Sequence, residues 1–185
     1  MLYSTTVSTK KELEQIQILN QQNLKQNLSE DEMLQEGFVS WNYSLELLEK
    51  MHQLAPSAIV KDGDEVIGYA LVTLKEARCF HVDFEKMITN LQPVIYEGKP
   101  LMLFHFYLMG QVCIHKNYRG KGVFPLLFQQ HKISYGNQYE LLVTEISAKN
   151  HRSLKAHEKI GFKNIFAYSE GIDEWNVVAW NWLSP

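Results

Sequence analysis

The chain has 185 residues, of which 45% are hydrophobic and 12% aromatic, values ordinary for a folded protein with a substantial core. Its formal net charge is −3, and its lysines and arginines are scattered rather than massed into a basic run. This distribution argues against nucleic acid or a membrane surface as the partner. The chain shows no repeat and no linker, so we expect a single domain over residues 1–185.

The cysteines and the apolar segments indicate a cytoplasmic protein. Cys79 and Cys113 are not part of a CxxC pair, which fits a reducing compartment. The amino terminus, MLYSTTVSTKKELEQ, lacks the apolar core of a signal peptide. The most apolar run, LMLFHFYLMG, is about half as long as a membrane-spanning helix. We therefore expect a cytoplasmic location.

Roughly the first 55 residues carry helical signals. Thr9 with Glu12 and Ser29 with Glu32 match the capping box that opens many helices. The stretch SLELLEKMHQL is amphipathic and ends before Pro56, as helices usually end ahead of a proline. These patterns predict helices beginning near residues 9 and 29 and a further helix that ends before residue 56.

The middle of the chain changes from helical to strand-like patterns. Apolar and β-branched residues flank Asp62-Gly63, a dipeptide suited to a tight turn, so residues 57–76 are expected to form two antiparallel strands. A short helical pattern, VDFEKMITNL, ends before Pro93. The long run PLMLFHFYLMGQVCI is too apolar for a half-exposed strand. It predicts a central strand buried on both faces.

The remaining elements follow in quick succession. A helix is expected from about Val123 to Ser134, and YELLVTEISA is expected to be another central strand. The segment NHRSLKAHEKIGF predicts a short helix stopped by Gly161. The last segment predicts two strands joined at Gly171.

The turn YRGKG between the long strand and the next helix predicts an anion socket. Glycines at 120 and 122 let the chain turn sharply with exposed N–H groups. A Walker loop requires Gly-Lys-Ser/Thr, which is absent, and the dinucleotide fingerprint GxGxxG would need a third glycine where Pro125 stands. A structural turn with no ligand remains an alternative.

Two segments of the chain resemble the cofactor motifs of the GNAT superfamily of N-acetyltransferases. YRGKG is similar to the pyrophosphate loop of that family, with Arg119 and Gly122 in place and Phe124 where glycine or alanine is usual. NHRSLKAHEKIGF is similar to the second motif, an asparagine followed by a helix that ends in Gly-Phe. The resemblance runs from about residue 57 to the end. It implies an α/β fold: a mixed, mostly antiparallel sheet with a splayed central parallel strand pair and flanking helices.

The resemblance also implies a site for acetyl-coenzyme A as a cosubstrate. Its pantetheine arm would lie between the splayed strands, against the backbone of Val112, Cys113 and Ile114. Its pyrophosphate would meet the N–H groups of the loop and of the helix that follows. The cofactor-binding residues expected from the two motifs are Arg119, Gly120, Lys121, Gly122, Val123, Phe124, Asn150 and His157.

Acetyl transfer to an amine needs a route for the amine proton, because an ordinary lysine-like amine is almost wholly protonated at pH 7. In the resembling family an acidic residue or histidine often stands on the strand before the loop, but the matching positions hold Leu108 and Gly110. We predict that Glu145 serves instead, since a carboxylate inside LLVTEISA is costly to bury without a reason. The alternatives for this residue are a strand-edge carboxylate paired with a lysine or arginine and a carboxylate that points into solvent.

His105 and Tyr107 on the long strand and Glu36 in the amino-terminal segment are the other polar residues that could act as the base. Glu36 could instead line an amine pocket with Phe38 and Trp41.

For the departing thiolate, the family commonly uses a tyrosine seven residues after the asparagine, a position held here by His157. A titratable imidazole could donate a proton there, or His157 could be a half-exposed helix residue with no role. Cys113 is expected to be a buried filler rather than a nucleophile. The seven histidines show no HxxxH or HExxH spacing, so no metal site is expected.

Three functions follow from these observations. The first is an acetyl-CoA-dependent N-acetyltransferase that transfers an acetyl group to a primary amine, on a small molecule or a protein, by direct attack in a ternary complex. The second is a CoA-binding module of the same fold with weak or lost catalysis, which Leu108, Gly110 and His157 suggest. The third is an interaction domain whose glycine turn is only structural. The chain is expected to be a monomer or homodimer.

Overall fold

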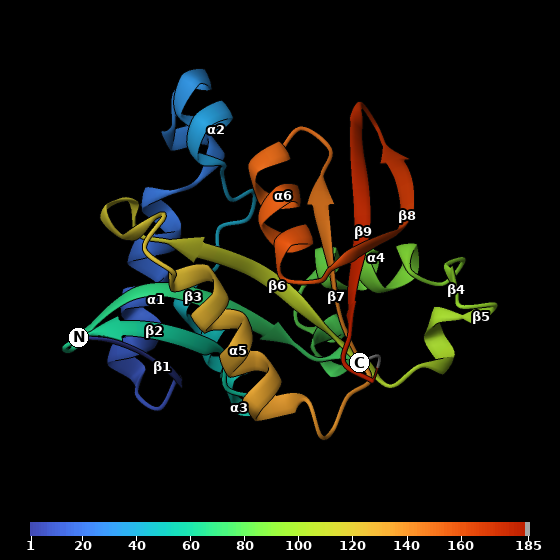
Figure 1. Ribbon diagram of the computed structural model, residues 1–185, viewed down its shortest axis with the longest axis horizontal. Helices are drawn as coiled ribbons and strands as arrows, with labels where there is room; N and C mark the ends of the chain where they lie inside the picture. Colours follow the sequence, from blue (N-terminus) through green and yellow to red (C-terminus); the bar gives the residue numbers. More distant parts are fainter. Residues whose placement is uncertain (184–185) are drawn as a thin grey trace.

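The computed structural model describes residues 1–183, and Figure 1 shows helices on both faces of a twisted sheet. The elements are β1 (Leu2–Thr6), α1 (Lys10–Gln22), α2 (Glu30–Glu36), α3 (Leu45–Leu54), β2 (Ala58–Asp62), β3 (Glu65–Thr73), α4 (Val82–Asn90), β4 (Ile95–Tyr96), β5 (Lys99–Pro100), β6 (Phe106–Ile114), α5 (Val123–Tyr135), β7 (Leu141–Ser147), α6 (His151–Lys159), β8 (Lys163–Glu170) and β9 (Asp173–Asn181).

Within the described residues seven strands form one sheet in the order β1-β2-β3-β6-β7-β9-β8, and β4 pairs only with β5. Neighbouring strands of the large sheet are antiparallel except for β6 and β7, which are parallel. The expected fold class is confirmed. In the same residues no helix is both long and apolar enough to cross a membrane.

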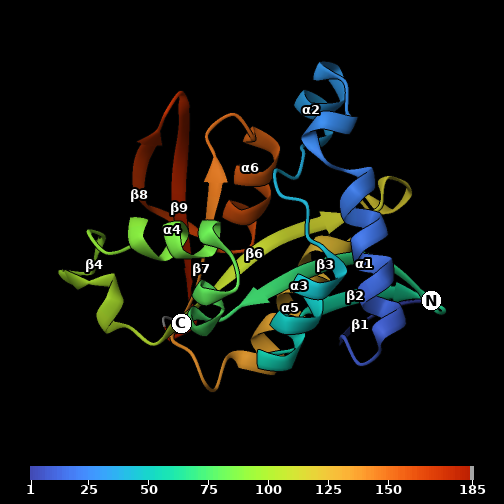
Figure 2. The ribbon, with the colours of Figure 1, turned by 180° about the vertical axis from the view of Figure 1, so that it is seen from behind.

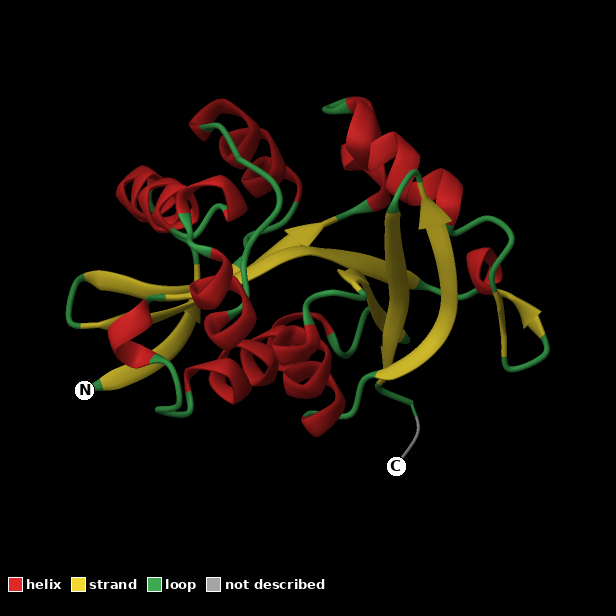
Figure 3. Cartoon of the chain, turned by 90° about the horizontal axis from the view of Figure 1, so that it is seen from above, coloured by secondary structure: helices red, strands yellow, loops and turns green. Residues whose placement is uncertain are grey.

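Helices cover the two faces of the sheet unequally. α1 and α3 pack over β3 on one face, and Figure 2 shows them there with α4 farther along the same face. α5 packs on the opposite face against β1, β2 and β3, where Leu127 and Phe128 join a separate apolar cluster with Val60 and Ile67. Figure 3 shows the two helix layers with the sheet between them. The core is therefore two apolar layers separated by β3 and β6.

The local signals in the sequence predict the element starts correctly. The Thr9 hydroxyl accepts from the Glu12 N–H at 3.3 Å, and the Glu12 carboxylate accepts from the Thr9 N–H at 3.1 Å, which completes the capping box of α1. Ser29 and Glu32 do the same for α2. The hairpin of β2 and β3 also forms as predicted.

Two predictions of strand structure need correction. The amino terminus contains β1, an edge strand that pairs with β2 and that the Ser/Thr-rich stretch LYSTT does not signal by apolar alternation. The run at 100–114 is not one strand, because residues 101–103 form a 3₁₀ turn and β6 begins only at Phe106. The central, two-faced position expected for this strand is confirmed for β6.

A bulge interrupts β6 in the middle. Ala70 of β3 pairs with Val112, but Val72 pairs with Met109. Between these two pairs β3 has one residue and β6 has two, so β6 contains one extra residue. The extra residue lies at Gly110 or Gln111. A bulge re-aims the side chains that follow it and is common beside active sites.

Candidate active site between two diverging strands

The parallel strands β6 and β7 separate halfway along their length. Their pairing runs from Phe106–Leu141 to Leu108–Val143 and stops there. The Thr144 hydroxyl still donates to the Met109 carbonyl at 2.8 Å, and beyond it the strands diverge. In the described part of the chain, the edge of β6 that faces β7 therefore has no strand partner from Gly110 onward, and its backbone groups are open to a ligand.

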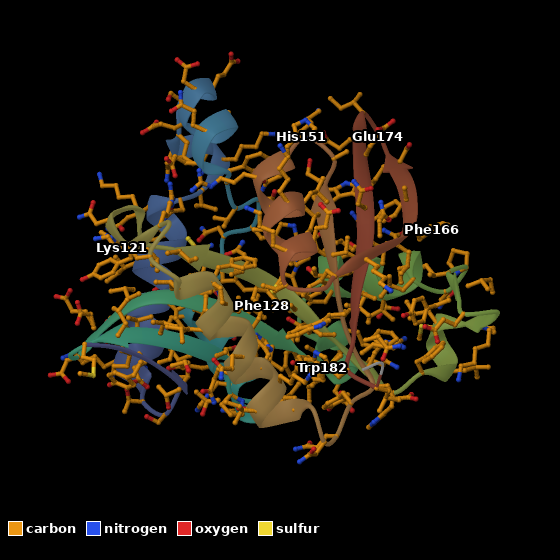
Figure 4. The ribbon with its side chains drawn as sticks, viewed as in Figure 1. Lys121, Phe128, His151, Phe166, Glu174 and Trp182 are labelled. Atoms are coloured by element: carbon orange, nitrogen blue, oxygen red, sulfur yellow. The ribbon has the colours of Figure 1, made fainter. Side chains whose placement is uncertain are left out.

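The glycine loop before α5 has the geometry of an anion socket. Gly120 and Gly122 have φ of 74° and 79°, in the left-handed region where glycine is favoured, and a Cβ at either position would meet nothing within 4 Å. Gly122 is the N-cap of α5 and makes no side-chain cap. Pro125 sits in the first turn of α5, where its missing N–H has no intrahelical partner to lose. Figure 4 shows Lys121 on this loop.

Arg119 is held in place by three partners. Its Nε donates to the Ile114 carbonyl at 3.2 Å, Nη1 to Glu36 at 2.9 Å and Nη2 to Asn23 at 2.6 Å. The Glu36 carboxylate also lies 3.5 Å from Nη2 of Arg152 on α6. One carboxylate at the end of α2 thus bridges a guanidinium from each of the two segments that resemble cofactor motifs.

Asn150 connects α6 to the loop after α2. Its side-chain oxygen accepts from the Ser153 N–H at 3.2 Å and so caps α6, while its amide donates to the Phe38 carbonyl at 3.2 Å. A Cβ on Gly37 would lie only 3.1 Å from the same Asn150 oxygen. The loop after α2 can therefore pass close to α6 because residue 37 is a glycine. His151, the first residue of α6, is labelled in Figure 4.

A cleft of about 450 Å³ lies between these segments. It is lined by seven of the residues predicted to bind the cofactor: Val112, Cys113, Ile114, Arg119, Gly120, Phe124 and Asn150. Lys121, Gly122 and Val123 are outside its lining, and Val123 is buried against the sheet beside Gly68. Gly122 therefore determines the backbone conformation of the loop and does not itself contact the cleft.

Sequence patterns did not predict several residues that line this cleft. Arg152, Lys155 and Lys159 of α6 were not expected at any site, and Glu36 at the end of α2 and Phe38 just after it were expected to line an amine pocket instead. The spacing of the three basic residues by three and four positions is a helical signal that could have revealed a cationic face. Nothing local in the sequence indicates that the amino-terminal segment returns to this cleft.

Glu145 lies on β7 just beyond the point where the strands separate. It lines a second cavity of about 220 Å³ together with Gly110 and His157. Burial raises the pKa of its carboxyl to about 7, a hydrogen bond from Tyr168 opposes the rise, and the charge of Glu170 adds to it. Its Oε1 is buried and has no hydrogen-bond partner among the described residues. Within residues 1–183 this carboxylate forms no ion pair, so the structural ion pair considered as its alternative role is absent there.

The vacant positions on β6 are filled by other side chains. A Cβ on Gly110 would lie 2.6 Å from the Thr73 hydroxyl and 2.9 Å from the Tyr43 hydroxyl, so no acidic side chain fits there. Leu108 is fully buried in the apolar cluster under α4.

The other candidate bases lie away from the cavity. The Tyr107 hydroxyl bonds to Nδ1 of the buried His131 at 2.7 Å, and His105 stacks on Tyr139 beyond the other end of β6. Phe38 lines both cavities, but Glu36 lines only the larger cleft and Trp41 only the cavity beside Glu145. The three residues expected to form an amine pocket therefore do not line one cavity together.

His157 is placed differently from the half-exposed histidine considered above. Its side chain is 1% exposed, among the rings of Phe124, Phe128 and Phe162. Burial lowers its pKa to about 4, so the imidazole is neutral at pH 7. Nδ1 lies 2.8 Å from the Ser153 carbonyl and carries the proton, since a carbonyl can only accept. Nε2 then has a lone pair and no partner in the described residues, so it can accept a proton but not donate one.

The structure gives no reactive role to Cys113 or to a metal ion among the described residues. Burial raises the pKa of the Cys113 thiol to about 12, and its sulfur lies toward the Leu19 carbonyl of α1 at 4.0 Å, as expected for a filler. Within residues 1–183 no three His, Cys, Asp or Glu side chains are grouped so that they could hold a metal ion.

Comparison with solved structures places this geometry in a known fold. The ribosomal-protein-S18-alanine N-acetyltransferase of Escherichia coli superposes over 98% of this chain and 94% of its own, with a TM-score of 0.62 and 11% identity. The ribosomal-protein-alanine N-acetyltransferase of Brucella melitensis covers 96% and 98%, with a TM-score of 0.61 and 16% identity. The NatC complex bound to Gag peptide and CoA contains a chain that matches with a TM-score of 0.62, 13% identity and coverage of 97% and 98%.

The chain therefore has the fold of the GNAT acetyltransferases over nearly its whole length. No family model matches its sequence, and no curated protein matches it either. At these identities the likeness concerns the fold, and the reaction has to be inferred from the residues of this chain.

Proposed function

We propose that this protein is an acetyl-CoA-dependent N-acetyltransferase with a primary amine as acceptor. The observation that carries the proposal is Glu145 at the point where β6 and β7 diverge, a half-buried carboxyl whose Oε1 is buried and has no hydrogen-bond partner among the described residues. A carboxyl with a pKa near 7 is half ionised at physiological pH and suited to general base catalysis.

The residues around the larger cleft fit coenzyme A. The open edge of β6 at Val112–Ile114 offers backbone groups to an amide-containing arm. Arg119 and Arg152, together with the N–H groups at the start of α5, suit a pyrophosphate. Bound acetyl-CoA would supply the acetyl group as an activated thioester. The two cavities share Val112 and Asn150, so the thioester and Glu145 would meet where the cavities join.

The residues of this chain can activate the acceptor amine by removing a proton from it. An incoming ammonium gives one proton to the ionised Glu145 carboxylate, and the neutral nitrogen attacks the carbonyl carbon of the thioester. The carbon–sulfur bond breaks with its electron pair on sulfur. A second proton leaves the nitrogen and ends on the thiolate, so the products are an amide and a free thiol, and the proton on Glu145 returns to water.

His157 was expected from the sequence to donate a proton to the thiolate, but its protonation state suits a different role. Its neutral ring and free Nε2 lone pair can accept a hydrogen bond where a thiol S–H forms, but cannot give a proton to a thiolate. We propose that His157 orients the sulfur and that the proton comes from the amine nitrogen. The edge-on packing of Phe124 and Phe128 against the ring supports a fixed orientation.

The test is acetyl-CoA binding by calorimetry together with mass analysis of products from a panel of amines. The panel contains diamines, amino acids, aminoglycosides, aryl amines and lysine peptides. An acetylated product that disappears with Glu145→Gln supports the proposal. Binding without any product would favour the CoA-binding module, and no binding would favour the interaction domain.

A further inference from the structure

The cavity beside Glu145 has a charge pattern that acetyl transfer alone does not require. Asp83 at the start of α4 and Glu170 at the end of β8 also line it. Lys86 is the one lysine or arginine among its described lining residues, and it lies 3.9 Å from Asp83. Asp83 therefore has a basic neighbour, whereas Glu145 and Glu170 give the cavity an excess of negative charge.

A second observation, separate from the number of carboxylates, concerns two polar atoms of the same cavity that have no hydrogen-bond partner among the described residues. Oε1 of Glu145 and Nε2 of His157 are buried and unpaired within the described part of the chain, and the side chain of His157 is 1% exposed. Unpaired buried acceptors are costly, so their presence in a cavity points to a ligand that donates hydrogen bonds. Both atoms belong to residues that line the cavity.

Aromatic side chains line the same cavity. Trp41 lies between α2 and α3, and Tyr168 and Trp175 are register partners on β8 and β9. Aromatic faces attract cations and also pack against methylene groups. Glu170 follows Tyr168 at the exposed end of β8, and its charge acts on both Glu145 and Tyr168. Because Glu170 is exposed and Oε1 of Glu145 is buried, Glu170 lies at the mouth of the cavity and Oε1 of Glu145 lies deeper.

We propose that the acceptor is a small aliphatic dication, an α,ω-diamine or short polyamine, whose second ammonium is bound by Glu170 at the mouth. This inference rests on the proposed function, because it names the acceptor of the same site. A protein amino terminus supplies one ammonium and would leave Glu170 unmatched. The cavity of about 220 Å³ is also below the range of roughly 300–1,000 Å³ typical of drug-sized ligands, which suits a short chain.

The deciding experiment compares three acceptors of similar length in the presence of acetyl-CoA: 1,4-diaminobutane, n-butylamine and 4-amino-1-butanol. Only the first carries a second positive charge. We expect its KM to be lower by roughly two- to fivefold, the size of one exposed ion pair. In Glu170→Gln, the KM for 1,4-diaminobutane should rise to that for n-butylamine, so that the two amines are no longer discriminated. The ratio of the two KM values within each protein is the readout, because Glu170 also acts on the pKa of Glu145 and can change kcat for both amines.

Glu174→Gln is the matched control, because Glu174 is an exposed carboxylate at the tip of the same hairpin (Figure 4). It should leave the discrimination between the three amines unchanged. Calorimetric binding of 1,4-diaminobutane and n-butylamine to the CoA-bound protein gives a second readout that needs no turnover and no variant.

The outcomes separate the two proposals. Equal KM values for the diamine and the monoamine, or faster acetylation of peptide amino termini, would overturn the dication inference and leave the transferase standing. Preferential diamine binding with no acetylated product would support the inference about the cavity and overturn the transferase. A preference that survives Glu170→Gln would overturn the role of Glu170.

Discussion

Glu145 should lower the stability of the protein at neutral and alkaline pH. Its folded pKa of about 7 lies above the ordinary value of 4.5. The native carboxyl thus holds its proton more tightly than the unfolded one. The stability that it contributes below pH 4.5 is lost as pH rises toward 7. Glu145→Gln removes this loss, so at pH 8 the variant should be more stable by roughly 1–3 kcal/mol while its transfer rate collapses. Urea unfolding at pH 5 and pH 8 checks this, and a destabilised variant at pH 8 would indicate a hidden structural partner.

His157 should not contribute an imidazolium to the reaction. With a native pKa of about 4, it is neutral throughout the range in which Glu145 becomes ionised. We therefore expect kcat to rise with pH through about 7 and to show no fall on the alkaline side up to pH 9. His157→Gln, which keeps an acceptor, should retain more activity than His157→Phe. An alkaline fall that disappears in both variants would instead identify His157 as an acid.

At the scale of elements, α2 places an anion where an anionic cofactor is expected. Glu36 at its end pairs with Arg119 at 2.9 Å and lies near Arg152. Because a pyrophosphate would compete for the same guanidiniums, Glu36→Gln should tighten acetyl-CoA binding several-fold in calorimetry and leave the acceptor KM unchanged. Glu30→Gln, on the exposed first turn of α2, is the control. Weaker binding in Glu36→Gln would mean that the carboxylate mainly positions Arg119.

The loop before α5 depends on the backbone of Gly122. Its φ of 79° is strained for any residue with a Cβ, although a Cβ would meet no atom within 4 Å. Gly122→Ala should therefore destabilise the protein by about 1–2 kcal/mol and weaken acetyl-CoA binding by disturbing the loop rather than by blocking it. Thermal unfolding and calorimetry together test this. Unchanged stability would show that the loop can relax to another conformation.

Sequence patterns predicted the parts of this fold that short-range forces determine. The capping boxes at Thr9 and Ser29 and the helix after Asn150 depend on neighbours within a few residues, and all form as expected. The bulge at Gly110 or Gln111 and the contact of Glu36 with Arg119 depend on pairings between residues far apart in the chain. Periodicity does not record such pairings, which is why sequence patterns did not place Glu36 beside the glycine loop.

For the whole molecule, buried histidines should make the fold sensitive to mild acid. His131 and His157 both have native pKa values lowered to about 4 by burial, so each is neutral in the fold and charges only on unfolding. Their folded pKa values lie below the ordinary 6.5. The stability that they contribute is therefore complete above pH 6.5 and is lost as pH falls toward 4.

A second loss of stability, caused by protonation of Glu12, should follow at lower pH. Burial opposes ionisation of Glu12, but its bonds to Lys61 and to the Ser8 and Thr9 N–H groups outweigh burial and lower its pKa to about 2. Its contribution is lost between pH 4.5 and 2. Urea midpoints should be measured from pH 7 to 3 on Glu145→Gln, because in the wild type the protonation of Glu145 stabilises the fold over the same range and opposes the loss from the histidines. In this variant the midpoints should fall in two stages, and a flat profile between pH 6.5 and 4 would contradict the neutral histidines.

The central claim is that this chain transfers acetyl groups to amines with Glu145 as the base. The most direct measurement is the initial rate of thiol release from acetyl-CoA at pH 8, with and without 1,4-diaminobutane, for the wild type and Glu145→Gln. We predict amine-dependent release by the wild type and a loss of at least about a hundredfold in the variant, the usual contribution of a general base. Amine-dependent release of equal rate in both proteins would contradict the claim.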